Sequence, residues 1–304
     1  MAKYLDPKND LVFKRVFGEH PHLLISFLNA LMPLEKGNEI ESIEYLSPEL
    51  VPENPLKKRS IVDVRCKDKQ GRFFIVEMQM EWSSAFMQRM LLNASKVFGT
   101  QLDKGKDFNL LQPVYALAIL NDDFDHKTKN FYHRFQFLNK DNTNEVIDGI
   151  ELIFVELQKF KPEKLTDKKM AILWLRFLKE VNEKNAVISS ELMDNPDIHT
   201  AIDICEKAGF TEAELQSYDE YWDQISYEVS IVSEGYRKGE AKGKAEGKAE
   251  GLNEGVDIGE WNKAVKVILK GNKAGMSVDA LAALTELSPE QVTAILKEQG
   301  LLNS

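Results

Sequence analysis

Two acidic residues lie inside apolar, strand-forming segments of this chain. Asp63 lies in the Val/Ile-rich stretch 60–66, and Glu77 lies in the Phe/Ile/Val-rich stretch 73–80. A carboxylate buried among such residues costs several kcal/mol unless a partner satisfies it. One divalent cation held by both carboxylates would satisfy them together, and such a cation promotes reactions of phosphate esters. The pattern therefore indicates metal-dependent chemistry on phosphate esters.

The two stretches are predicted to form a β-hairpin that brings the acids level with each other. Side chains alternate across a strand, so Glu77 and Gln79 share one face of the second strand. By the same rule, Val62 and Val64 share the face opposite to Asp63. The link between the strands is polar and contains a glycine, which predicts a turn. A hairpin with one solvated face, on which both acids are ordinary surface residues, is the alternative.

The hairpin and the residues before it are basic, although the whole chain is acidic. The net charge of −10 argues against a protein that coats nucleic acid nonspecifically, but local charge decides more than the total. Seven lysines and arginines lie between residues 57 and 72, against two aspartates. We expect this rim to attract the DNA backbone; a solvated loop is the alternative. The expected DNA contacts here are Lys57, Lys58, Arg59 and Arg65.

Bulk composition is that of a globular protein. The 304 residues, 43% hydrophobic and 29% charged, suffice for one sizeable core and a smaller appendage. Cys66 and Cys205 provide neither a disulfide framework nor a zinc site. The chain opens without an apolar leader, and no apolar run approaches the roughly 18–20 residues that span a bilayer. We expect a soluble, cytoplasmic protein with no membrane segment.

The order of predicted elements is that of an α/β fold followed by a mostly helical C-terminal part. We divide the chain into a core (1–160), a helical extension (161–232), a glycine-periodic segment (233–260) and a small helical module (261–304). Helices are predicted at 7–18, 22–31, 83–102, 171–178 and 198–208, and strands at 40–46, 60–66, 73–80, 114–120, 131–138 and 151–157.

The glycine-periodic segment repeats glycine at every fourth position from Gly235 to Gly259. Each glycine costs a helix about 1 kcal/mol relative to alanine. The segment is therefore either a flexible charged tether, or a helix that recovers the loss by packing closely against a second copy. We favour the second copy and expect a homo-oligomer. The module 261–304 resembles a helix-turn-helix DNA reader, but its last helix, 289–297, carries one lysine, and an interaction module is an equal alternative.

Several of these segments resemble one nuclease family. Asp63, the turn and the run Glu77-Met78-Gln79 look like the PD-(D/E)XK signature. Residues 9–18, and Arg89 with 101–115, are similar to motifs of its recombination-promoting nucleases, a branch also described as transposases. The resemblance covers roughly the first 230 residues. It departs from the signature at its last position, where glutamine replaces lysine and removes a positive charge.

The resemblance implies a central mixed β-sheet flanked by helices and a DNA endonuclease that uses Mg²⁺ or Mn²⁺ to hydrolyse phosphodiester bonds. It implies that Asp63, Glu77 and the backbone carbonyl of Met78 hold the ion, and that Gln79 orients the attacking water or contacts the phosphate. It also suggests accessory roles for three further side chains. These are Asp10 as an extra acid, Lys14 as a phosphate contact and Arg89 as a DNA contact.

Alternatives remain open at this point. Asp10 and Lys14 are four residues apart, and a simple surface ion pair is an equal interpretation. The glutamine at position 79 also fits a catalytically decayed nuclease fold that acts as an oligomerising interaction protein. A transposase that joins DNA strands would share the same site, and the sequence does not separate strand transfer from hydrolysis.

Overall fold

The structure is a computed structural model that describes residues 3–50, 60–162, 169–185 and 187–301. Two compact units divide the chain, Met1–Val229 and Ser230–Ser304, here called the N-terminal and C-terminal units. Among the described residues, no helix is both long enough and apolar enough to span a membrane.

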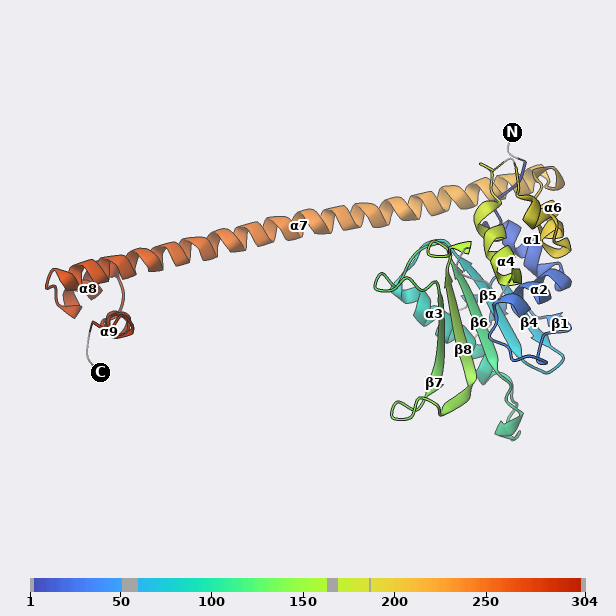
Figure 1. The fold of residues 1–304 in the computed structure, drawn as a ribbon, viewed down its shortest axis with the longest axis horizontal. Coiled ribbons are helices and arrows are strands. Elements are labelled where there is room, and N and C mark those ends of the chain that lie inside the picture. The colour runs from blue at the N-terminus through green and yellow to red at the C-terminus, as the bar shows by residue number, and fades with distance from the viewer. Residues whose placement is uncertain (1–2, 51–59, 163–168, 186, 302–304) are drawn as a thin grey trace. The chain divides into compact units, whose positions relative to one another are not determined.

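A six-stranded mixed sheet forms the centre of the N-terminal unit (Figure 1). β5, β6 and β8 run parallel to one another, whereas β1, β4 and β7 pair antiparallel with their neighbours. The predicted mixed sheet is thereby confirmed. β6 is apolar throughout and buried on both faces, as expected for a central strand. The strands, in spatial order, are β1 (Ile43–Tyr45), β4 (Val64–Asp68), β5 (Phe73–Gln79), β6 (Val114–Leu120), β8 (Val146–Glu156) and β7 (Tyr132–Leu138).

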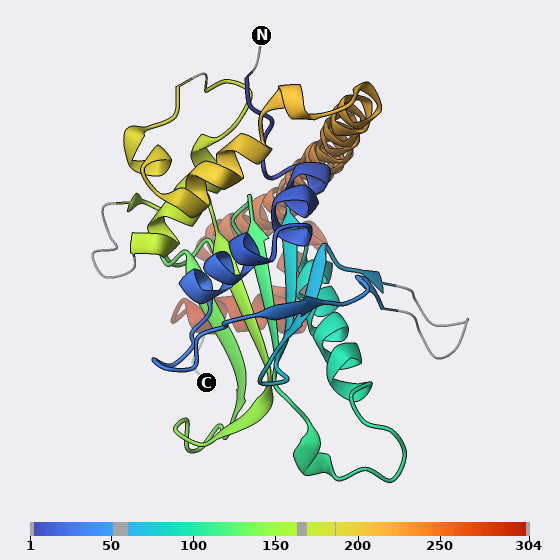
Figure 2. The same ribbon diagram turned by 90° about the vertical axis from the view of Figure 1, so that its right-hand side faces the viewer.

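Helices cover both faces of this sheet and bury two separate apolar clusters (Figures 1 and 2). α3 (Ser84–Gly99) packs on one face, against β6 and β8. The opposite face carries the larger cluster, in which Trp174 packs against Phe17 and Phe27. The helices that contribute to that cluster include α1 (Asp10–Gly18), α2 (Pro21–Leu31), α4 (Lys169–Glu180), α5 (Ser190–Met193), α6 (Pro196–Ile204) and the start of α7 (Glu212–Lys273).

The predicted strand 60–66 is broken in the structure. β3 (Ser60–Ile61) pairs with β2 (Glu49–Leu50) in a separate two-stranded sheet, and β4 starts only at Val64. Val62 packs in the α3-side cluster and Val64 in the opposite cluster. The prediction that these two valines share a face is therefore wrong, because the chain bends between them. Asp63 lies at this bend.

The start of the first helix also differs from its prediction. α1 begins at Asp10, and Asn9 is its N-cap, with a side-chain oxygen that accepts a hydrogen bond from the Leu11 amide. Asp6 instead accepts the amide of Lys8 at 2.9 Å. The predicted start at residue 7 is thus wrong, because Asn9 caps the helix and satisfies a free amide of its first turn.

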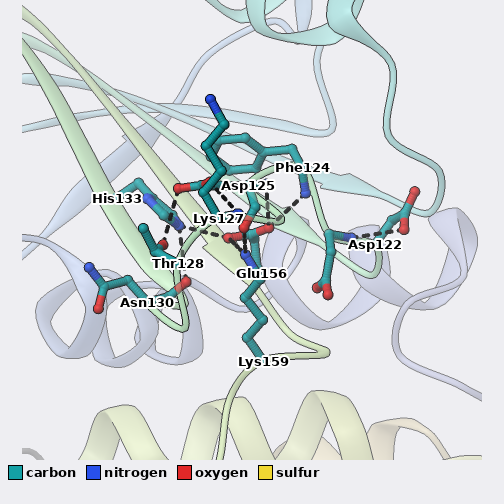
Figure 3. A network of polar contacts seen from close by, with 10 residues as sticks. Asp122, Phe124, Asp125, Lys127, Thr128, Asn130, His133, Glu156 and Lys159 are labelled. Carbon is teal, nitrogen blue, oxygen red and sulfur yellow. Dashed lines mark hydrogen bonds and ion pairs between the residues drawn. The ribbon is translucent and has the colours of Figure 1, made fainter.

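A buried carboxylate anchors the loop that follows β6 (Figure 3). Glu156 ends β8 and has no exposed surface. One of its oxygens accepts the amides of Phe124 and Asp125 at 2.7 and 3.2 Å; the other is bonded to Lys159 and to a ring nitrogen of His133. Burial opposes ionisation, but these hydrogen bonds outweigh it and keep the pKa of Glu156 below its ordinary value. A buried charge with this many partners fixes the loop on the sheet.

α7 (Glu212–Lys273) begins in the N-terminal unit and contains the whole glycine-periodic segment, which is therefore helical in the structure. In the C-terminal unit, α8 (Val278–Thr285) and α9 (Pro289–Glu298) pack around Ile268 of α7. Gly271 permits this packing, since a Cβ atom there would lie 2.4 Å from a methyl carbon of Leu281.

Candidate active site

A pocket of about 710 Å³ lies at the carboxyl end of β5. Six of the predicted residues line it, and five of these are Asp63, Glu77, Met78, Gln79 and, from α1, Asp10. The helix α3 contributes Arg89. The structure therefore brings most of the predicted site residues into a single concave site, which is the usual form of an enzyme active site.

Asp63 reaches the pocket from the bend before β4. One of its carboxylate oxygens accepts the backbone amide of Met78 at 2.6 Å. Burial raises the pKa of Asp63 to about 7, despite the hydrogen bond from Met78, and the charges of Asp10 and Glu77 add to the rise. The carboxyl group is thus costly to ionise without a cation.

Met78 presents its backbone to Asp63 because β4 is shorter than β5. The pairing with β5 ends at Val64, the first residue of β4, which lies opposite Val76, two residues before Met78. In an extended strand, the N–H and C=O of one residue point to the same side. Since the Met78 amide is bonded to Asp63, its carbonyl lies on the same edge of β5. The Gln79 carbonyl points the other way and accepts the Asn121 amide at 2.9 Å.

Glu77 is 5% exposed and is held from α3. Asn93, which is fully buried, donates its amide to one carboxylate oxygen at 3.0 Å. Arg89 lies 3.4 Å from the other. Burial raises the pKa of Glu77, and the charge of Arg89 and the Asn93 hydrogen bond only partly oppose it. Two neighbouring carboxyls that both resist ionisation are typical of functional sites.

Gln79 has partners for both ends of its amide. Its nitrogen donates to the carbonyl of Glu81 at 2.9 Å, and its oxygen accepts from Arg89 at 2.7 Å. The Arg89 guanidinium also lies 4.8 Å from the centre of the Phe86 ring. Arg89 is therefore fixed at three points: by Glu77, by Gln79 and by an aromatic ring one turn earlier on α3.

The other predicted residues divide into three groups. Asp10 and Lys14 form a half-exposed ion pair at 2.7 Å, and Asp10 lines the pocket as well. Arg65 donates weakly to the Ser47 carbonyl, at 3.4 Å, and is not among the residues that line the pocket. The remaining basic residues, Lys57, Lys58 and Arg59, lie outside the described residues.

Sequence reasoning missed the contribution of α7. Tyr221, Gln224 and Glu228 line the pocket from this helix. Burial raises the pKa of Tyr221, and the nearby carboxylates Asp10 and Asp63 raise it further. The helical spacing of Tyr218, Tyr221 and the residues after them could have shown that this segment packs on the unit. Nothing in that spacing indicated which surface it would cover. Asn93 was missed as well, because a single asparagine in an amphipathic helix gives no signal.

The donor atoms of the pocket suit a hard divalent cation. In the part of the chain that the structure describes, no group of three or more His, Cys, Asp or Glu residues is placed to hold a metal. Asp63 and Glu77 with the Met78 carbonyl offer only oxygen, however, and Mg²⁺ binds through one or two carboxylates while keeping several water molecules. The donor set fits such an ion.

Comparisons with known proteins agree with this geometry. A family model described as PD-(D/E)XK nuclease family transposase matches residues 7–233, which is well over half of the chain. No curated protein and no solved structure matches. The matched region contains the mixed sheet and every described residue that lines the pocket. The chain belongs to the PD-(D/E)XK nuclease family of transposases.

Proposed function

We propose that this protein is a divalent-metal-dependent DNA endonuclease that hydrolyses phosphodiester bonds, with a role in recombination or transposition. Asp63, Glu77 and the carbonyl of Met78 hold Mg²⁺ or Mn²⁺. The observation that carries this proposal is the pair of carboxyls, both with a pKa raised by burial, that line one pocket. Membership of a nuclease family makes DNA the expected partner.

The residues around the scissile phosphate have different roles in this proposal. A bound divalent ion would polarise the scissile phosphate and lower the pKa of the attacking water. Asp63 and Glu77 hold that ion in place, and Gln79 lies beside them at the phosphate. Asp10 is an accessory acid. The basic side chains Lys14, Lys57, Lys58, Arg59, Arg65 and Arg89 contact the DNA backbone.

Plasmid nicking tests the proposal. Purified protein is incubated with supercoiled plasmid, with Mg²⁺ or Mn²⁺ or with chelator, and the variants Asp63→Ala and Glu77→Ala are compared. Loss of a metal-holding carboxylate should lower the nicking rate at least about 100-fold. Asp141→Ala is the matched control, since this exposed acid lies in the turn between β7 and β8. Equal nicking by all four proteins would attribute the cleavage to another site or to a contaminant.

A decayed fold that works as an oligomerising interaction protein is the second candidate. It is favoured by the glutamine that replaces the lysine of the signature. It predicts that wild-type protein neither nicks DNA nor binds metal. A protein that binds metal and joins DNA ends would instead be a strand-transferring transposase that uses the same site.

A further inference from the structure

We infer that Arg89 is a catalytic residue, which supplies the positive charge at the scissile phosphate that position 79 lacks. This inference rests on the proposed endonuclease function. It assigns to one side chain a role more specific than contact with the DNA backbone.

The charge of the pocket is the first ground. Four acidic side chains line it, Asp10, Asp63, Glu77 and Glu228, and Arg89 is the sole lysine or arginine among the described residues that do so. A phosphodiester brings a further negative charge into this pocket, and more charge develops on its oxygens in the transition state. A fixed cation aimed at those oxygens stabilises the transition state more than the ground state. Lys14, the nearest alternative, is paired with Asp10 at 2.7 Å.

The second ground is the way Gln79 is bonded. The Gln79 nitrogen is engaged by the Glu81 carbonyl, so the oxygen faces Arg89 and accepts its hydrogen bond at 2.7 Å. A lysine at position 79 would bring its own ammonium group to this place. Gln79 instead accepts a hydrogen bond from the guanidinium of Arg89, which lies on α3, so Gln79 acts as a positioning residue for Arg89.

The third ground is that Arg89 is oriented yet still accessible. Glu77, Gln79 and the Phe86 ring fix its position, while its side chain remains 50% exposed. A guanidinium carries five donors in a fixed fork, so Arg89 can keep these contacts and still donate to a phosphate oxygen. In the reaction, the oxygen of water forms a bond to phosphorus and releases one proton to solvent, while the bond from phosphorus to the leaving sugar oxygen breaks. That oxygen takes up a proton from solvent, and Arg89 stays charged throughout.

Moving the charge back to position 79 tests this assignment. The variants are Arg89→Met, which removes the charge but leaves an unbranched apolar side chain beside Phe86, Gln79→Lys, and the double variant Gln79→Lys/Arg89→Met. Each is assayed for the rate of plasmid nicking at saturating Mn²⁺ and for the Kd of a DNA duplex in Ca²⁺. Lys140→Met, in the exposed turn between β7 and β8, is the matched control.

We expect Arg89→Met to lower the rate at saturating DNA about 100-fold while the Kd changes less than about 5-fold. The double variant should recover at least about 10-fold of the lost rate, because the lysine at position 79 of β5 returns the positive charge that α3 has lost. A weaker Kd with an unchanged rate would make Arg89 an ordinary backbone contact and overturn the assignment. A double variant no faster than Arg89→Met would overturn it too.

The role of Arg89 and the endonuclease activity can be tested separately. If wild type nicks DNA in a metal-dependent manner that Asp63→Ala abolishes, and Arg89→Met matches wild type, only the role of Arg89 is wrong. If wild type itself does not nick with any of the metals, the endonuclease proposal is wrong and the role of Arg89 falls with it. Circular dichroism of each variant confirms that the fold is retained.

Discussion

At the scale of single residues, the site is built on two carboxyl groups whose ionisation the fold makes costly. Asp63 and Glu77 both have raised pKa values because burial disfavours their charged forms. A carboxyl whose pKa is raised on folding contributes its full stability below its unfolded pKa and loses it as the pH rises through the folded pKa. Such a pair is destabilising near neutral pH until a cation binds between its members.

This cost is measurable in metal-free protein. We predict that Asp63→Asn raises the free energy of unfolding above about pH 7 by roughly 1–3 kcal/mol, because the amide carries no charge and still accepts the Met78 amide hydrogen. The gain should shrink toward zero near pH 4, the unfolded pKa of an aspartate.

Urea denaturation in chelator at about pH 4, 6 and 8 measures it, with Asp141→Asn as the exposed control. A difference between wild type and Asp63→Asn that is constant over this range would show that the Asp63 carboxyl is not perturbed.

At the scale of elements, the sequence predicted the regular strands well and the breaks poorly. The apolar run 114–120 matches β6 at both ends, and 73–80 extends one residue beyond β5. A continuous apolar run bounded by polar residues predicts a buried strand, and the change from apolar to polar residues shows where the strand ends. The bend at Asp63 could not be predicted in this way. Apolar and polar residues alternate from Val62 to Cys66, across the bend, and only the pairing of 60–61 and 64–68 with different sheets divides the stretch.

The break between β3 and β4, which the sequence did not predict, creates the geometry of the site. Because β4 starts after Asp63, the Met78 amide has no strand partner there and bonds to the carboxylate instead. The pairing of Asp63 with Glu77 was thus predicted from residue types, but the geometry came from strand lengths. The contribution of α7 to the lining of the pocket could not be predicted, because Tyr221 and Glu228 lie about 150 residues from Glu77 in the sequence.

At the scale of the whole molecule, α7 joins the N-terminal unit to the C-terminal unit and carries the seven periodic glycines, Gly235 to Gly259, inside a helix. Their combined propensity cost is on the order of 5–7 kcal/mol. The ion pairs along this segment, such as Lys238 with Glu234 and Lys244 with Glu240, return only about 0.3–0.5 kcal/mol each. We therefore propose that a second copy of the segment packs against the glycines and makes the protein a homo-oligomer.

Replacing three glycines separates self-association from a tether. In Gly239→Ala/Gly243→Ala/Gly247→Ala, each new methyl group meets no described atom within 4 Å, apart from the nearby backbone of its own helix. An isolated helix should therefore gain about 2–3 kcal/mol of helix propensity. In a closely packed pair, the same methyl groups would keep the two backbones apart.

We predict that light scattering gives a lower mass for this variant than for wild type at equal concentration. An unchanged mass together with higher helicity by circular dichroism would assign the segment as a tether.

The central claim is that Asp63 and Glu77 converge on one cation, and calorimetric titration with Mn²⁺ tests it most directly. Wild type should bind one ion per chain, more tightly at about pH 8 than at pH 6, because both carboxyls must lose their protons to bind. Asp63→Ala and Glu77→Ala should each abolish the binding heat, whereas Asp141→Ala should retain it. No heat with wild type, or equal heat with all four proteins, would contradict the claim.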